Sequence, residues 1–187
     1  MKILVAYATK HGSTREVADA VAAALGDAGF DVHVHAAATV RDVDGYDAVV
    51  VGGSIYMGKW HSDAIRLIRR HTRALSAIPV GVFAIGPKTL DRADVANSRA
   101  QLDAALAKAS DVRPASTAIF GGVIDPSKLR FPFNRMPASD ARDWNEIAAW
   151  ARDFGAIVAR ATSVVPADAG SATLPMKLAR WTETIEA

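Results

Sequence analysis

Residues 2–14 read KILVAYATKHGST, and this stretch decides the fold. Residues 2–8 form a short apolar run that is typical of a buried strand. From residue 13 to residue 28, apolar side chains recur at helical spacing, and Gly29 follows as a stop signal. A strand that passes through a short polar loop into a helix is the opening of a β-α-β unit.

The same alternation of strand and helix continues along the chain. We predict further strands at 32–38, 47–53, 78–85 and 115–120, and further helices at 62–75, 93–109 and 143–161. The segment 47–53, DAVVVGG, is almost continuously apolar, as a strand buried on both faces should be. The pattern therefore predicts an α/β, doubly wound domain in which helices cover both faces of a five-stranded parallel sheet.

In a doubly wound domain, ligands bind beyond the carboxyl ends of the strands. The loops 8–13, 53–61, 86–92 and 121–142 are therefore expected to carry the function. The first of these loops, 9–14, reads TKHGST and lies where a helix N-terminus offers free N–H groups and a positive dipole end. This arrangement suits a phosphate group. The alternative is an ordinary helix cap made by the hydroxyl of Ser13 or Thr14.

Composition excludes several kinds of site. The chain of 187 residues has no cysteine, which rules out a thiol nucleophile, a thiolate zinc site and an iron–sulfur cluster. Neither the G-x-G-x-x-G motif of dinucleotide-binding proteins nor the P-loop motif of nucleoside triphosphatases is present. His33 and His35 share one strand face without a nearby acidic cluster, so we predict no metal site.

The chain is expected to divide into a domain, 1–162, and a tail, 163–187. The tail begins with a linker rich in Pro, Gly, Ala and Ser, and then places apolar residues at helical spacing in a short amphipathic helix. A helix of about a dozen residues is marginal alone, so we expect it to dock on its own domain or on a second copy in a homodimer, with a membrane or a redox partner as the alternative. Since no stretch reaches the ~20 apolar residues that span a bilayer and the N-terminus does not match a cleavable signal, we expect a cytoplasmic protein.

Two of the loops resemble those of a known family. Residues 9–14 match T-x-x-G-x-T, and residues 52–62, GGSIYMGKWHS, are similar to the G-[AG]-S-I-x-x-G-x-x-H-S segment of menaquinone-dependent protoporphyrinogen dehydrogenases of the flavodoxin fold. The resemblance covers residues 2–160. The flavodoxin loop has a hydroxyl residue where this chain has His11, whose imidazole N–H is a substitute donor. The resemblance implies the sheet order 2-1-3-4-5 and the cofactor FMN.

The resemblance also implies which residues bind FMN. The phosphate would be held by Thr9, Lys10, His11, Gly12, Ser13 and Thr14. One side of the ring would be lined by Ser54, Ile55, Tyr56, Met57, Gly58 and Trp60, and the other side by Gly86, Pro87 and Lys88. Tyr56 and Trp60 either contact the ring or pack within their loop. His61 caps the helix that starts at Ser62, lines the pocket or acts as a catalytic proton carrier, and no other catalytic residue is identified.

By this resemblance, the chain would be an FMN-dependent oxidoreductase that passes electrons from a reduced small molecule, protoporphyrinogen IX, to a quinone. One alternative is a flavodoxin-like electron carrier without a substrate of its own. Carriers of that kind are generally acidic, whereas this chain has a net charge of +2 and a pI near 9.0, which weighs against that alternative. Another alternative is an NAD(P)H:quinone reductase, which the missing dinucleotide loop disfavours.

Two basic segments suggest further contacts. Residues 59–73 carry five Lys or Arg residues against one Asp, which indicates either a solvated helix face or a surface for anionic lipid or an acidic substrate. Residues 128–136 mix basic and aromatic residues within an insertion, 123–137, that is shorter than in the dehydrogenases resembled. Both segments are candidates for peripheral contact at the inner face of the membrane. For 128–136 the alternatives are binding of a flat apolar substrate and side chains that fold back over the sheet. Nucleic acid is not expected at 59–73, because that segment lacks the aromatic interleaving of a base-stacking platform.

Overall fold

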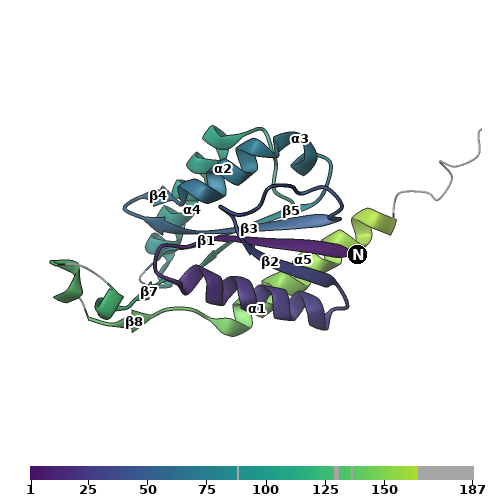
Figure 1. The fold of residues 1–187 in the computed structure, drawn as a ribbon. Coiled ribbons are helices and arrows are strands. Elements are labelled where there is room, and N and C mark those ends of the chain that lie inside the picture. Colours follow the sequence, from purple (N-terminus) through teal and green to yellow (C-terminus); the bar gives the residue numbers. More distant parts are fainter. Residues whose placement is uncertain (88, 129–130, 136, 164–187) are drawn as a thin grey trace, which may run out of the picture.

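The computed structural model describes residues 1–87, 89–128, 131–135 and 137–163 (Figure 1). The strands are β1 Lys2–Ala8, β2 Asp31–Ala36, β3 Ala48–Tyr56, β4 Lys59–Trp60, β5 Val80–Ile85, β6 Ser116–Phe120, β7 Val123–Ile124 and β8 Ser139–Asp140. The α-helices are α1 Ser13–Asp27, α2 Ser62–Arg70, α3 Thr72–Leu75, α4 Arg92–Ala109 and α5 Trp144–Ser163. Short 3₁₀ turns occupy Pro126–Lys128 and Phe133–Arg135.

The main sheet has the strand order β2-β1-β3-β5-β6, and all four of its pairings are parallel. The predicted order 2-1-3-4-5 is confirmed, since β5 and β6 are the fourth and fifth of the predicted strands. The short strand β4 pairs antiparallel with the end of β3, and β7 pairs antiparallel with β8 in a separate ribbon. The carboxyl ends of β1, β3 and β5 therefore lie side by side at one edge.

Helices cover both faces of this sheet, as predicted. In Figure 1, α1 and α5 lie on one face, and α2, α3 and α4 lie on the other. Each face has its own apolar core: Val17 and Phe154 belong to the first, and Leu67 and Leu102 to the second. The central strands supply side chains to both cores, which explains their continuous apolar sequence.

The strand predicted at 47–53 is longer than expected, because β3 passes through Gly52 and Gly53 and continues to Tyr56. A β-carbon on Gly52 would collide with the ring of Phe83. A β-carbon on Gly53 would lie 2.6 Å from Nε1 of Trp60 on the opposite face. These positions need glycine because an aromatic ring packs directly on each face of the strand.

Two other predicted boundaries differ for local reasons. The second strand ends at Ala36 rather than residue 38, since Thr39 turns back and donates from both its N–H and its hydroxyl to the Ala36 carbonyl. The helix predicted at 62–75 is two helices that meet at His71. The Thr72 hydroxyl donates to the Ile68 carbonyl at 3.0 Å and so competes with the backbone bond that would continue the helix.

The predicted linker and amphipathic helix at 163–187 lie outside the described residues, apart from Ser163, which ends α5. Within the part of the chain that is described, no helix is both long enough and apolar enough to cross a bilayer.

Candidate functional site

The first loop of the site joins β1 to α1. Gly12 is the N-cap of α1 and has a φ of 97°, a left-handed conformation that favours glycine. Its N–H donates to the Thr9 hydroxyl at 2.9 Å, and its carbonyl accepts from the N–H of Arg15 at 3.0 Å. The N–H groups of Ser13 and Thr14 come before the first helical hydrogen bonds, so they remain available to an anion.

Thr14 supplies the clearest test of whether this loop suits a phosphate. Its side chain is fully buried, and Oγ1 has no hydrogen-bond partner among the described residues. A buried hydroxyl without a partner costs free energy unless a ligand satisfies it. The alternative of a hydroxyl cap by Ser13 or Thr14 is wrong, because the N-cap is Gly12 and α1 has no side-chain cap. The loop therefore fits a phosphate group.

The second loop is a tight β-hairpin rather than an irregular segment. Tyr56 pairs with Lys59 across a two-residue turn, Met57-Gly58. Both turn residues have positive φ, 49° and 74°, as in the type I′ turns that match the twist of a hairpin. The turn leaves Met57 79% exposed and Tyr56 43% exposed at the edge of the site.

Tyr56 connects this hairpin to the first loop. The ammonium of Lys10 lies 4.4 Å from the centroid of the tyrosine ring, a cation–π distance. The imidazole of His11 meets the same ring edge-on, with centroids 6.5 Å apart. The predicted phosphate loop and ring loop are thus in direct contact through three side chains.

The third loop follows β5. A β-carbon on Gly86 would lie 3.0 Å from Cβ of Ile55, so this loop approaches the hairpin closely. Pro87 is buried, and its carbonyl accepts from the N–H of Gly122 at 2.8 Å. Lys88 lies outside the described residues.

Asp91 links the third loop to α4 as its N-cap, accepting from the N–H groups of Ala93 and Asp94. The Thr89 hydroxyl lies 2.6 Å from the Asp91 carboxylate and 2.9 Å from that of Asp94. The bond from Thr89 and the bond from the Asp94 N–H hold the pKa of Asp91 below its usual value. Asp91 therefore stays ionised and fixes the start of α4.

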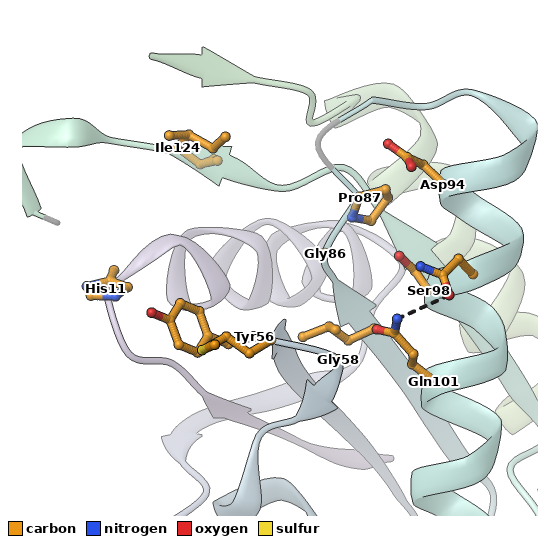
Figure 2. A pocket seen from close by; sticks show the side chains of 13 residues that line it. His11, Tyr56, Gly58, Gly86, Pro87, Asp94, Ser98, Gln101 and Ile124 are labelled. Atoms are coloured by element: carbon orange, nitrogen blue, oxygen red, sulfur yellow. Dashed lines mark hydrogen bonds between the residues drawn. The ribbon is translucent and has the colours of Figure 1, made fainter. Parts of the chain in front are cut away.

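These loops enclose a cleft of about 520 Å³, within the usual range for small-molecule sites (Figure 2). Several predicted cofactor residues line it, namely His11, Ile55, Tyr56, Met57, Gly58, Gly86 and Pro87. Figure 2 shows His11 and Tyr56 across the cleft from the side chains of α4. The other residues of the 9–14 loop adjoin His11 in sequence, and Ser54 precedes Ile55 within β3.

Sequence reasoning missed the wall that α4 contributes. Asp94, Asn97, Ser98 and Gln101 line the cleft from this helix, and the Gln101 amide donates to Asn97 Oδ1 at 3.2 Å. Their spacing places all four on one helical face. That spacing was the one sequence signal for a polar wall on this helix, but a polar face on a helix more often faces solvent.

Two predicted residues take other places. Trp60 is only 2% exposed and is absent from the cleft lining, and its indole Nε1 donates to the Gly53 carbonyl at 3.1 Å. Its observed role is packing of the hairpin. His61 is the N-cap of α2, with Nδ1 accepting from the N–H of Asp63 at 3.3 Å. The capping interpretation of His61 is confirmed.

The ribbon of β7 and β8 forms the remaining wall, through Val123 and Ile124. Arg142, 8% exposed, anchors this ribbon, with 2.6 Å contacts from its guanidinium to both Asp140 and Glu16 of α1. The guanidinium also lies 4.6 Å from the ring of Trp144. The bond from Arg142 holds the pKa of Asp140 below its usual value.

The fold and the site together define a nucleotide-binding protein of the doubly wound class. The parallel sheet has the order 2-1-3-4-5, the loop at the first helix suits a phosphate, and the cleft adjoins this loop where the strand order reverses. The sequence model of the flavodoxin domain matches residues 4–136, and this chain belongs to the flavodoxin domain family. Its cofactor is FMN, and the partnerless hydroxyl of Thr14 fits the phosphate of that group.

Individual proteins agree with this assignment. The chain is 25% identical over 183 residues to the protoporphyrinogen IX dehydrogenase [quinone] of Escherichia coli strain K12, covering 87% of this chain and 99% of that protein. Among solved structures, a flavodoxin variant from Pseudomonas aeruginosa has a TM-score of 0.57 at 18% identity, covering 85% and 99% of the two chains. The flavodoxin of Streptococcus pneumoniae TIGR4 has a TM-score of 0.55 at 19% identity, covering 86% and 99%. These structures support the flavodoxin fold, and the dehydrogenase supports a redox role.

Proposed function

We propose that this chain is an FMN-dependent oxidoreductase that takes electrons from protoporphyrinogen IX and passes them to a quinone. The observation that carries the proposal is the cleft of about 520 Å³ beside the phosphate-type loop, which gives a small-molecule substrate access to the cofactor site. The similarity to a protoporphyrinogen dehydrogenase over 99% of that protein's length supports this choice of substrate.

The residues of this chain bind the cofactor and position the substrate. The first loop holds the phosphate through the N–H groups of its helix start and the hydroxyl of Thr14. Tyr56 and Pro87 provide apolar walls on two sides of the cleft. FMN held there would supply the redox chemistry, a two-electron transfer between the reduced substrate and the quinone.

The α4 wall supplies hydrogen bonds. The Gln101 NH₂ group donates to Asn97 Oδ1. The Gln101 carbonyl can therefore still accept a hydrogen bond from a ligand, and the Asn97 NH₂ group can still donate one. Two amides on neighbouring turns can therefore orient a flat molecule by its polar edge. Each oxidation step removes two electrons and two protons from the porphyrinogen, and the quinone takes up the same number to become a quinol.

The net charge of the chain also favours an enzyme with its own substrate over a flavodoxin-like electron carrier. The net charge of +2 and the pI near 9.0 favour an anionic substrate over docking on a basic reductase. The protein is expected to bind a carboxylate-bearing small molecule more readily than to act as an acidic shuttle.

The test is anaerobic mixing of the FMN-loaded protein with one donor at a time, following the loss of oxidised flavin absorbance. We expect protoporphyrinogen IX to reduce the protein rapidly, and NADH and NADPH to reduce it far more slowly. Reduction by the nicotinamides alone would identify a quinone reductase instead. Reduction by none of the three would leave the electron carrier as the better interpretation.

A further inference from the structure

A second groove adjoins the cleft. It has a volume of about 740 Å³, lies between β4, α2 and α4, and shares Gly58 and Gln101 with the cleft. Its apolar lining comes from Trp60 on β4, from Ile65 on α2 and from Ala100, Ala104 and Ala105 on α4. The small alanine side chains leave room for a flat apolar group to lie against the helix.

Four cations line this groove, Lys59, Arg66, Arg69 and Lys108, and none of the described residues that line it is acidic. Two of the four already have partners. Arg66 pairs with Asp63 at 2.9 Å, and the guanidinium of Arg69 donates to the Lys108 carbonyl at 2.7 Å, which closes the end of α4.

The other two cations, Lys59 and Lys108, are exposed, and no carboxylate of the described residues lies within 4.0 Å of either ammonium. Lys59 stands on β4, and Lys108 stands in the last turn of α4. The groove thus combines an apolar floor with two ammonium groups that are available to anions.

We infer that this groove binds the carboxylate-bearing edge of a flat apolar dicarboxylate, while the rest of the ligand reaches the cleft past Gly58 and Gln101. The inference rests on the proposed function, because protoporphyrinogen IX combines an apolar macrocycle with two propionates. The basic segment 59–73 then serves an acidic substrate through the residues that face the groove. Arg70 and Arg73 of the same segment are not among those that line it.

The test compares two double variants that lose equal charge. Lys59→Gln/Lys108→Gln removes the two available ammonium groups, and Arg70→Gln/Arg73→Gln removes two arginines outside the groove. Binding of protoporphyrin IX and of its dimethyl ester to each FMN-loaded protein is measured by porphyrin fluorescence. We expect the lysine variant to weaken binding of the diacid about tenfold, the sum of two modest ion pairs, with little effect on the ester. The arginine variant should bind both ligands as the parent protein does.

Three results would overturn the inference: equal affinity of both variants for the diacid, an ester that binds the parent protein as tightly as the diacid, or porphyrin that fails to bind. Displacement of the porphyrin by NADPH at equal concentration would assign the groove to a nucleotide and would also overturn it. Turnover separates this inference from the proposed function. If binding depends on the two lysines but the protein does not oxidise porphyrinogen, the proposed function is wrong and the inference about the groove stands. If the protein oxidises porphyrinogen and the lysine variant has an unchanged KM, the proposed function stands and the inference about the groove is wrong.

Discussion

The indole of Trp60 and the backbone of Gly53 hold the β3–β4 hairpin together, through a hydrogen bond of 3.1 Å from Nε1 to the glycine carbonyl. Each residue requires the other. The indole can approach the strand so closely only because Gly53 has no side chain, and the buried N–H finds its acceptor in the same residue. This contact fixes the hairpin, and the hairpin places Tyr56 beside the cleft.

Gly53→Ala should therefore destabilise the protein. The new β-carbon would lie 2.6 Å from Nε1, so the indole must shift and lose its hydrogen bond. We expect the free energy of unfolding to fall by about 2–4 kcal/mol, from overpacking and the lost bond together. Urea unfolding followed by circular dichroism measures it.

Gly26→Ala is the matched control, since Gly26 lies within α1 and a β-carbon there would meet nothing within 4 Å. Removing a helical glycine should raise the free energy of unfolding by about 0.5–1 kcal/mol. Equal losses in the two variants would contradict the role given to the Trp60 contact.

Thr14→Val should have opposite effects on the free protein and on FMN binding. Valine has nearly the same shape and removes a buried hydroxyl without a partner, so the FMN-free protein should gain about 1 kcal/mol of stability. FMN affinity should fall at least about tenfold, because a hydrogen bond to a charged phosphate is lost. Calorimetric unfolding and flavin titration measure the two quantities. Thr39→Val, in the turn after β2, serves as the control, and unchanged FMN affinity in Thr14→Val would refute the phosphate assignment.

Met57→Asn should stabilise the hairpin. Met57 has a φ of 49° and is 79% exposed, so asparagine relieves backbone strain and sacrifices little burial. We expect a gain of about 0.5–1 kcal/mol in thermal or urea unfolding. Met57→Ala keeps the unfavourable φ and should show no gain, and a comparable gain in that variant would argue against strain as the cause.

Arg142→Met should lower stability in a pH-dependent way. Asp140 has its pKa lowered by the bond from Arg142, so this pair contributes stability above the unfolded value of about 3.9 and loses it as pH falls through the lower folded value. We expect a loss of about 1–2 kcal/mol at pH 7 that shrinks below about pH 4. Urea unfolding at several pH values measures the difference, which would stay constant if the ion pairs contributed nothing.

The apolar runs and helical spacings were enough to predict the parallel sheet and the helices on both faces, and the resemblance to the flavodoxin fold supplied the strand order. The β3–β4 hairpin was missed for two reasons. Met57-Gly58 lacks the Asn-Gly signal of such turns, and the predicted strand stopped at Gly53, although aromatic rings from other segments impose both Gly52 and Gly53. Contacts of that kind are tertiary, so no local pattern reports them.

In the candidate site, too, residues with a recognisable local pattern were predicted, and residues placed by tertiary contacts were missed. His11, Tyr56 and Gly86 belong to loops with a recognisable local sequence, and all three line the cleft. The polar wall of α4 was missed because Asn97 and Gln101 look like an ordinary solvated helix face until the hairpin is placed opposite them. Of the two roles left open for Trp60, a ring contact or packing within its loop, the structure shows packing, and its burial follows from β4, a strand of two residues that no pattern predicts.

The most direct test of the central claim is anaerobic steady-state turnover, with FMN-loaded protein, protoporphyrinogen IX and a soluble menaquinone analogue, following porphyrin fluorescence. The proposed function predicts porphyrin formation that requires both the protein and the quinone and exceeds a blank containing free FMN. Formation no faster than the free-FMN blank, in protein that demonstrably retains its flavin, would contradict it.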